Sequence, residues 1–407
     1  MQPPPRRFVV YNNVTAIRRP SGKVVLAGRL ISGMEAHAQH WDGDLACVCE
    51  PVPESELTDN LDRALGGDNV EVDPRDLPFE LVVADFESAE AKRTLAESTI
   101  AMAGIGYRAT HLSEWGAELD VPVVYGTEYD LRTRLQAARA EISNPVRLAR
   151  RALWETLLER KQQRAIRKAV GVQCNGTPTY EAYRVINPNA MLFFDGRVSD
   201  DMLANDEEQR ARHGRLQSNQ PLRLAWSGRM NRMKGADQLP QFAQELKALG
   251  VPFQLDIFGG GTLEDSIRRD VAERGLEDCV DVKGFVDFYE VLTPYLKREV
   301  DVWVCPHPQG DPSGAYMEAF GDGLPIIGYA NDALAGMLER VDAGRTVALN
   351  DPKALAQEVA SANRNRTQLV QWSQTAREYA AEHTFDKSFA RRMRHIDALL
   401  SVRAERV

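Results

Sequence analysis

A stretch bounded by glycines in the middle of the chain, S-G-R-M-N-R-M-K-G at 227–235, carries the cations Arg229 and Lys234. The apolar run at 222–226 before it predicts a buried strand, and the segment at 236–250 after it has apolar residues at helical spacing. At the carboxyl end of a parallel strand, free backbone N–H groups and the helix dipole favour an anion. A planar guanidinium and a compact ammonium can share the oxygens of a diphosphate. The stretch therefore indicates a diphosphate site, and the alternative is a surface loop with ordinary basic residues.

A second candidate anion site lies at 306–329. The turn D-P-S-G at 311–314 predicts the start of a helix, whose free N–H groups at 313–317 would point toward the first site. Glu318, about one turn into this helix, could accept hydrogen bonds from the vicinal hydroxyls of a ribose. A plainer role for Glu318 is to stabilise the helix dipole.

Three consecutive glycines at 259–261 follow a predicted strand at 253–258. A dinucleotide fingerprint would need a third, more distant glycine where Glu264 stands, so the pattern argues against an oxidoreductase. The glycines are instead expected to let a ligand or another domain approach the backbone closely.

The composition is that of a soluble globular protein: 407 residues, of which 43% are hydrophobic and 27% charged. A net charge of −9 argues against nucleic-acid binding. Five scattered cysteines argue against a disulfide framework and for a reducing compartment, and no residue spacing predicts a metal site. With no secretory signal pattern and no apolar run long enough to span a membrane, we expect a cytoplasmic protein.

Short apolar strands alternate with helices along the chain, as in parallel sheets covered on both faces. The fold class is therefore α/β, with two doubly wound, Rossmann-like domains at 1–200 and 222–385. The charge-dense segment at 201–221 predicts the linker between them.

The N-terminal half contains a predicted long helix over Ala89–Leu119. Its periodicity would place Tyr107, His111 and Trp115 on one helix face. Earlier in the same half, Gly33 is predicted to lie in a loop just before a helix that starts at Glu35.

A basic segment at 147–168 stands out in this acidic chain. Its apolar side consists of Leu153, Trp154, Leu157 and Leu158. A basic amphipathic helix can lie on an anionic membrane surface. The alternative is a solvated helix that packs its leucines on the domain.

The ordered motifs at 228–235, 256–261, 284–286 and 318–325 together resemble the donor-binding half of the GT-B glycosyltransferases of family four. The resemblance covers about 222–349, and more loosely the whole chain. It implies two Rossmann-like domains facing across a cleft, with the acceptor bound by the first and a nucleotide sugar by the second. A terminal helix at 386–407 would pack back on the N-terminal domain.

The resemblance also implies an activity. The protein would move a sugar from a nucleotide-diphosphate donor to a glycan or lipid-linked acceptor, with retention of anomeric configuration and without a metal or resident cofactor. Such hexosyltransferases serve polysaccharide or glycoconjugate synthesis. The protein would then work in the cytoplasm, at the inner face of the membrane if the basic segment docks there.

Carried over by position, the resemblance assigns Arg229 and Lys234 to the diphosphate and Glu318 to the ribose. The family's first glutamate is Gly310 here, and Asp311 is the candidate to take over its contact with the donor sugar. The remaining residues expected at the nucleotide are mostly glycines and helix-start residues: Gly33, Gly228, Gly259, Gly284, Phe285, Val286, Ser313, Gly314, Ala315 and Tyr316.

Three N-terminal residues that end or flank predicted elements, Asp85, His111 and Glu128, are candidates to orient the acceptor hydroxyl, or else have structural roles. Two further functions stay open at this point. Gly310 is compatible with a scaffold that binds a nucleotide sugar without transferring it, and a GT-B epimerase is the third alternative.

Overall fold

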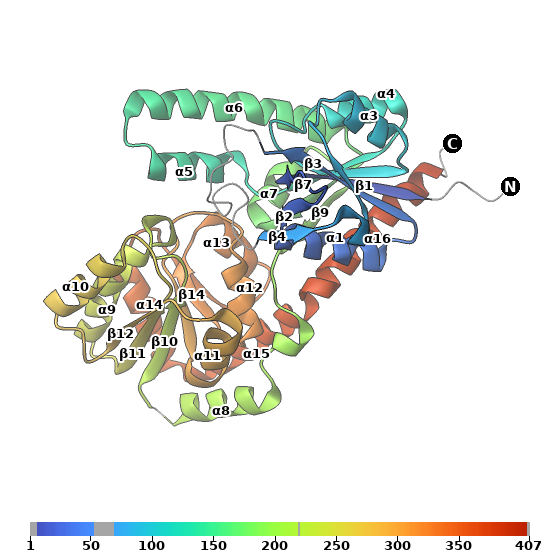
Figure 1. The fold of residues 1–407 in the computed structure, drawn as a ribbon. Helices are drawn as coiled ribbons and strands as arrows, with labels where there is room; N and C mark the ends of the chain where they lie inside the picture. The colour runs from blue at the N-terminus through green and yellow to red at the C-terminus, as the bar shows by residue number, and fades with distance from the viewer. Residues whose placement is uncertain (1–5, 53–68, 219, 405–407) are drawn as a thin grey trace.

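Two β-sheets, one mostly and one entirely parallel, form the centres of two lobes in the computed structural model, which describes residues 6–52, 69–218 and 220–404 (Figure 1). The predicted fold class, with two doubly wound α/β domains, is confirmed. The N-terminal lobe occupies the upper right of Figure 1 and the C-terminal lobe the lower left.

The N-terminal sheet has the order β5-β3-β1-β6-β7-β8-β9, with all of these neighbours parallel. The far end of the long strand β1 pairs with β2, and β2 pairs with β4, in antiparallel fashion. The strands are β1 (Arg7–Arg18), β2 (Val24–Ala27), β3 (Asp44–Pro51), β4 (Asn69–Val72), β5 (Glu80–Val83), β6 (Ile100–Gly104), β7 (Val123–Thr127), β8 (Gly171–Asn175) and β9 (Ala190–Phe193).

Helices cover both faces of this sheet, which explains why its central strands are apolar on both sides. They are α1 (Gly28–His40), α3 (Ala89–Ala96), α4 (Leu112–Leu119), α5 (Leu131–Glu141), α6 (Pro145–Lys168) and α7 (Gly176–Tyr183), with a short 3₁₀ turn η2 (Pro74–Asp76). The long α6 and the shorter α5 form an arm along the top of Figure 1.

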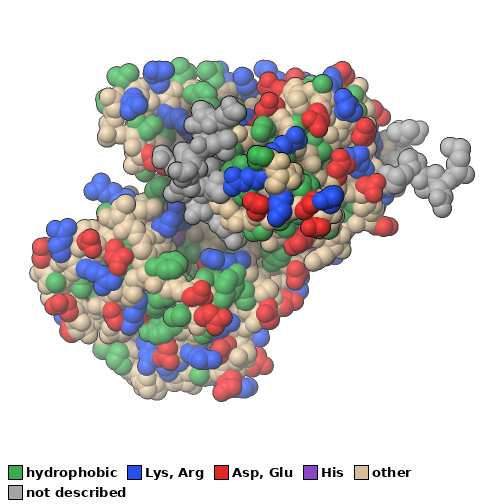
Figure 2. All heavy atoms as spheres, in the orientation of Figure 1, with side chains coloured by type: hydrophobic (Ala, Val, Ile, Leu, Met, Phe, Trp, Pro, Cys, Tyr) green, Lys and Arg blue, Asp and Glu red, His purple; other side chains and the backbone are tan. Residues whose placement is uncertain are grey.

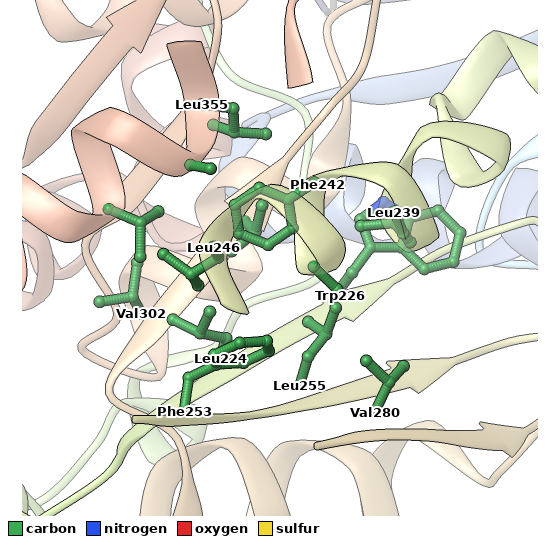
Figure 3. Close-up of a cluster of buried hydrophobic side chains, with 14 of the residues drawn as sticks. Leu224, Trp226, Leu239, Phe242, Leu246, Phe253, Leu255, Val280, Val302 and Leu355 are labelled. Atoms are coloured by element: carbon green, nitrogen blue, oxygen red, sulfur yellow. The ribbon is translucent and has the colours of Figure 1, made fainter. Parts of the chain in front are cut away.

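The C-terminal sheet is entirely parallel, in the order β12-β11-β10-β13-β14-β15. Its strands are β10 (Leu222–Ser227), β11 (Phe253–Phe258), β12 (Val280–Gly284), β13 (Val302–Cys305), β14 (Ile326–Tyr329) and β15 (Gly344–Val347). On one face, Trp226 of β10 lies among Leu239, Phe242 and Leu246, and this cluster continues to Leu355 (Figure 3). Each such buried side chain contributes about 1.5–3 kcal/mol.

The helices and helical turns of this half are α8 (Asp206–Gln217), α9 (Leu239–Ala248), α10 (Glu264–Glu273), α11 (Thr293–Glu299), α12 (Gly314–Gly321), α13 (Asp332–Leu338), α14 (Pro352–Arg364), α15 (Arg366–Glu382), α16 (Phe385–Ala404), η3 (Asp200–Met202), η4 (Arg232–Lys234), η5 (Ala236–Gln238) and η6 (Phe288–Leu292).

The prediction of one long helix over Ala89–Leu119 is wrong, because the buried strand β6 divides it into α3 and α4. Tyr107 therefore lies in a turn rather than on a shared helix face, while His111 immediately precedes α4. The sequence of β6 is I-A-M-A-G, whose alanines and methionine favour helices when they are considered without their neighbours.

The segment 201–221, expected as a linker, is also different in the structure. It contains α8, which packs on the C-terminal lobe through the fully buried Arg212. The Arg212 guanidinium donates to four backbone carbonyls, those of Val300, Gly323, Leu296 and Lys297. Burial lowers the pKa of Arg212 to about 10, so it stays charged at neutral pH. Helix α8 is anchored by this buried charge and not by a stripe of apolar residues, so its sequence does not show the pattern that predicts a helix.

The last helix, α16, leaves the C-terminal lobe and runs along α1 of the N-terminal lobe (Figure 1). His37 of α1 packs edge-on against Phe389, and its Nδ1 lies 3.3 Å from the Met393 sulfur. Arg392 donates to the side chain of Gln173 on β8. The end of the chain therefore ties the two lobes together.

Candidate functional site

The loops at the carboxyl ends of β10 and β11 touch through glycines. Gly259 has a φ of +117°, and a Cβ there would lie 1.9 Å from the carbonyl oxygen of Gly228. The Gly228 N–H donates to the carbonyl of Phe258, at 3.1 Å. The close approach expected at the glycines 259–261 is therefore made by the neighbouring loop of the same lobe.

A second glycine contact joins the β10 loop to the loop after β13. Gly235 has a φ of +64°, and a Cβ there would lie 1.8 Å from the carbonyl oxygen of Pro306. Just before it, the Asn231 side chain accepts from the backbone N–H of Lys234, which caps the short turn η4. This packing fixes the backbone of Lys234 beside the segment that follows β13.

Lys234 uses this position to reach Asp311. The Lys234 Nζ donates to Asp311 Oδ2 at 2.7 Å and to Ser313 Oγ at 3.3 Å. Both charged side chains are more than four-fifths buried. The pair therefore sits in a low-dielectric environment where each charge matters more than it would on the surface.

Arg229 belongs to the same region but is exposed. Its charge acts on Tyr129, which follows β7 in the N-terminal lobe. Burial raises the pKa of Tyr129, Glu128 and Asp311 raise it further, and Arg229 lowers it. Arg229 and Asp311, which carry opposite charges, thus both lie near Tyr129 of the N-terminal lobe.

A buried histidine lies behind Lys234. His307 is 1% exposed and packs between Trp303 and Tyr316. Within the described residues, neither of its ring nitrogens has a hydrogen-bond partner. Burial, with a smaller effect from Lys234, holds the pKa of His307 well below its ordinary value, so the ring is neutral. Because the neutral His307 ring carries no positive charge, it does not repel the ammonium of Lys234.

Helix α12 begins next to this pair, with Ser313 as its N-cap. The Ser313 N–H donates to the Asp311 carbonyl and the Tyr316 N–H to the Ser313 carbonyl. The backbone N–H groups of residues 313–317 were expected to be free, but those of Ser313 and Tyr316 already donate to carbonyl oxygens of the same segment. Gly314 and Ala315 open the first turn, where a helix has no internal acceptors.

Glu318, one turn into α12, forms an ion pair with Arg197 that sequence reasoning did not predict. Arg197 Nε donates to Glu318 Oε1 at 2.8 Å. The guanidinium carbon also lies 3.7 Å from the centre of the Phe288 ring. Arg197 lies on the segment that connects the lobes, in a polar stretch without any motif, so no sequence signal could have identified it.

The loop around Gly310 is held directly by the N-terminal lobe. The Gly310 N–H donates to the Gln136 side chain at 3.1 Å, and its carbonyl accepts from the Thr133 hydroxyl at 3.3 Å. Both partners lie on α5, whose Arg132 also pairs with Asp332 at 2.8 Å. A Cβ on Gly310 would lie 3.2 Å from the Cβ of Asp332, so a larger residue there would require Asp332 to shift by a few tenths of an ångström.

The predicted base-binding segment follows β12. Gly284 adopts a φ of +73° and Phe285 is 85% exposed, so its ring stands free of the lobe. Val286 packs instead against the core cluster that contains Tyr316 and Met317. Of the three residues, only Phe285 presents a side chain outward.

The N-terminal candidates are dispersed. Glu128 follows β7, where burial and nearby Asp195 raise the pKa of its carboxyl group against the opposing charge of Arg29. Because Glu128 and Tyr129 are consecutive residues after β7, both lie at the carboxyl end of that strand. Arg29 was not predicted, although it stands at the start of α1.

His111 and Asp85 are placed differently. One His111 ring nitrogen lies 3.0 Å from the Phe86 carbonyl and its ring packs against Trp115, which is a structural role. Asp85 is exposed, and its side chain makes no ion pair or hydrogen bond with any other residue the structure describes. Gly33 lies inside α1 rather than in a loop, so the expected glycine loop at that position is wrong.

The described part of the chain has neither a cluster of metal-ligating side chains nor a helix suited to crossing a bilayer. No group of three or more His, Cys, Asp or Glu side chains there could hold a metal ion. Within residues 6–52, 69–218 and 220–404, no helix has the length and apolar character needed to cross a bilayer.

Residues 207–379 match the sequence family described as Glycosyl transferases group 1. The chain is 30% identical over 179 residues to the putative colanic acid biosynthesis glycosyltransferase WcaL of Escherichia coli (strain K12), covering 42% of this chain and 43% of that protein. It is 32% identical over 143 residues to the amylovoran biosynthesis glycosyltransferase AmsK of Erwinia amylovora, covering 34% and 35%. The matched part is thus less than half of each curated relative.

Solved structures match nearly the whole chain. The structure of Anabaena Alr3699/HepE in complex with UDP has a TM-score of 0.65 at 11% identity, covering 96% of this chain and 99% of that one. WaaG, a glycosyltransferase involved in lipopolysaccharide biosynthesis, has a TM-score of 0.54 at 13% identity, covering 94% and 98%. At these identities the likeness is one of fold.

Proposed function

We propose that the chain, whose residues 207–379 match the glycosyl transferases group 1 family and whose fold resembles that of HepE, is a retaining glycosyltransferase that needs no metal ion. It transfers a hexose from a nucleoside diphosphate sugar to a glycan or lipid-linked acceptor in polysaccharide or glycoconjugate synthesis. The names of WcaL and AmsK, which place both in the biosynthesis of bacterial polysaccharides, support the last part of this proposal.

The observation that carries the proposal is the position of Lys234. Its ammonium is buried at the carboxyl ends of β10 and β13, where the first turn of α12 also begins. Arg229 lies on the same loop and acts on Tyr129 of the other lobe. Two cations and a helix N-terminus at one interlobe position suit a diphosphate.

The proposed chemistry needs this charge. The bond between the anomeric carbon and the diphosphate oxygen breaks while a bond from that carbon to the acceptor oxygen forms on the same face. The acceptor proton passes to the departing phosphate oxygen, so no separate protein base is required. Negative charge grows on the diphosphate during the step, and Lys234 and Arg229 stabilise it in the transition state.

The donor is proposed to lie with its ribose on Glu318. Arg197 occupies one side of that carboxylate through Oε1. A carboxylate has about four acceptor positions, so the other oxygen can still receive a ribose hydroxyl. The exposed ring of Phe285 offers a face on which a base can stack. HepE has been solved in complex with UDP and with UDP-glucose, which makes uridine donors the first to test.

A second candidate is a scaffold that binds a nucleotide sugar without transferring it. It is favoured by Gly310, which stands at the position of the first glutamate in the family that the chain resembles. The backbone of Gly310 is held by hydrogen bonds with the side chains of Thr133 and Gln136. Under this alternative, Asp311 serves only to hold Lys234.

The two candidates are separated by an assay with purified protein, a panel of nucleoside diphosphate sugars and lipid-linked glycan acceptors, run with a chelator present. The glycosyltransferase proposal expects turnover with at least one donor and a product of unchanged anomeric configuration. Tight nucleotide binding with no turnover for any pair would favour the scaffold. Turnover that requires an added divalent metal would overturn the metal-free mechanism.

A further inference from the structure

Helix α6 presents a mixed apolar and basic stripe to solvent. Positions three and four apart lie on one side of a helix, which places seven residues in a single row. These residues form the outer face of α6: Val146, Arg150, Leu153, Leu157, Lys161, Arg164 and Lys168. Val146, Leu153 and Leu157 are 68%, 62% and 47% exposed. The alternative that the leucines pack on the domain is therefore wrong for Leu153 and Leu157.

The opposite side of α6 is buried and carries polar residues beside apolar ones: Glu155, Glu159 and Gln162 with Leu158, Ala165 and Ile166. Burying carboxylates while leucines stay exposed is unusual for a surface helix. The guanidinium of Arg134 on α5 forms ion pairs with Glu155 at 2.9 Å and with Glu159 at 2.5 Å. It also donates a hydrogen bond to the side-chain oxygen of Gln162 at 2.8 Å. Turning the helix to bury its leucines would expose this network or break it, and breaking a buried ion pair costs several kcal/mol. The arrangement therefore holds the apolar row outward.

The charge on the outer side is unbalanced. Arg151 pairs with Glu155, and Lys168 pairs with Glu114. The remaining basic residues of α6 have no ion-pair partner in the ranges that the structure describes. They are Arg147, Arg150, Arg160, Lys161, Arg164 and Arg167. In a chain whose net charge is −9, this is a concentrated patch of the opposite sign.

Aromatic rings extend the apolar part of the surface. Trp154 is exposed beside the outer face, with its ring 6.3 Å from that of Tyr107, which is also exposed. The guanidinium of Arg151 lies over the Trp154 ring at 4.8 Å. Figure 2 shows apolar and basic side chains side by side along the edge of the molecule above α6.

We propose that the outer face of α6, with Trp154 and Tyr107, docks on an anionic lipid surface. Leucines and aromatic rings enter the headgroup boundary while the arginines and lysines contact acidic headgroups. A second copy of the chain is disfavoured as the occupant because a two-fold contact would place the same unpaired arginines against one another. This inference does not depend on the proposed transfer reaction.

The test is cosedimentation of the full chain with vesicles of phosphatidylcholine alone, or of phosphatidylcholine with 30% phosphatidylglycerol, at low and high salt. Two double variants, Leu153→Ser with Leu157→Ser and Arg150→Glu with Arg164→Glu, change the patch. Their matched controls, Val185→Ser with Leu249→Ser and Arg269→Glu with Arg298→Glu, change exposed residues elsewhere. Thermal unfolding of each variant checks that it remains folded.

The expected result is binding to the anionic vesicles that weakens with salt, with at least a tenfold loss in each patch variant and less than a twofold change in each control. Brominated lipid should quench the fluorescence of the native chain more than that of a Trp154→Phe variant. Equal binding to both vesicles, or equal losses in patch and control variants, would overturn the proposal. So would an absence of vesicle binding, which would leave this face for an acidic protein partner.

Discussion

The ammonium of Lys234 lies 2.7 Å from the carboxylate of Asp311, and the two side chains come from loops that follow different strands, β10 and β13. The contact joins a residue from each of the two segments predicted to bind anions. It places the cation where the first turn of α12 and the N-terminal lobe meet.

If the cations stabilise a departing diphosphate, Lys234→Ala and Arg229→Ala should each lower the rate of sugar transfer by about 100-fold, the effect of removing one charge-stabilising donor. Initial rates at saturating acceptor measure this. Arg232→Ala is the matched control, because Arg232 is an exposed cation on the same turn with no assigned role. Full activity in both site variants would show that the phosphate assignment is wrong.

Asp311→Asn separates binding from transfer. The Asp311 carboxylate competes with a diphosphate for Lys234, so the neutral variant should bind a nucleoside diphosphate more tightly. If Asp311 also contacts the donor sugar, its transfer rate should fall at least tenfold. Titration calorimetry and initial rates provide the two readouts. An unchanged rate together with tighter binding would assign Asp311 to holding Lys234 alone.

Gly235→Ala should destabilise the C-terminal lobe by more than about 3 kcal/mol, from the left-handed backbone and the clash with Pro306 together. Gly275→Ala is the control, because Gly275 has a φ of +61° but open space around it. It should cost only about 1–2 kcal/mol. Urea unfolding measures both, and equal losses would contradict the tight contact between the β10 and β13 loops.

Acid should weaken the docking of α16. Burial lowers the pKa of His37 to about 3, below its ordinary value of 6.5. Such a histidine contributes stability above pH 6.5, and that contribution is lost as the pH falls toward 3. At pH 5 the loss from this one group is about 2 kcal/mol. A His37→Leu variant should therefore lose less stability than the native chain between pH 7.5 and 5 in urea unfolding, and identical losses would contradict the burial of a neutral ring.

The C-terminal fold was largely predictable because its strands are apolar runs that end at glycines, as at 222–228 and 253–259. Strand β6 was missed because alanine and methionine carry no β preference, and only its neighbours make it a strand. Helix α8 was missed because its anchor is Arg212, a charge that is satisfied by distant carbonyls.

The site was predictable only in its parts. Glycines and cations mark the loop at 227–235, but nothing in the sequence indicates that Lys234 meets Asp311, 77 positions away. Arg197 reaches Glu318 from the connection between the lobes, in a segment with no motif. The outward direction of Leu153 depends on the Arg134 network on the far side of α6, which is a tertiary feature.

The most direct test of the diphosphate site compares the affinity for a nucleoside diphosphate with that for the matching nucleoside, in chelator, for the native chain and for Lys234→Ala with Arg229→Ala. The diphosphate to use is the one among UDP, GDP, ADP and TDP that raises the melting temperature most. We expect the native chain to prefer the diphosphate by at least 100-fold and the double variant to lose most of that preference. An unchanged preference in the double variant would contradict the claim that these two cations hold the diphosphate.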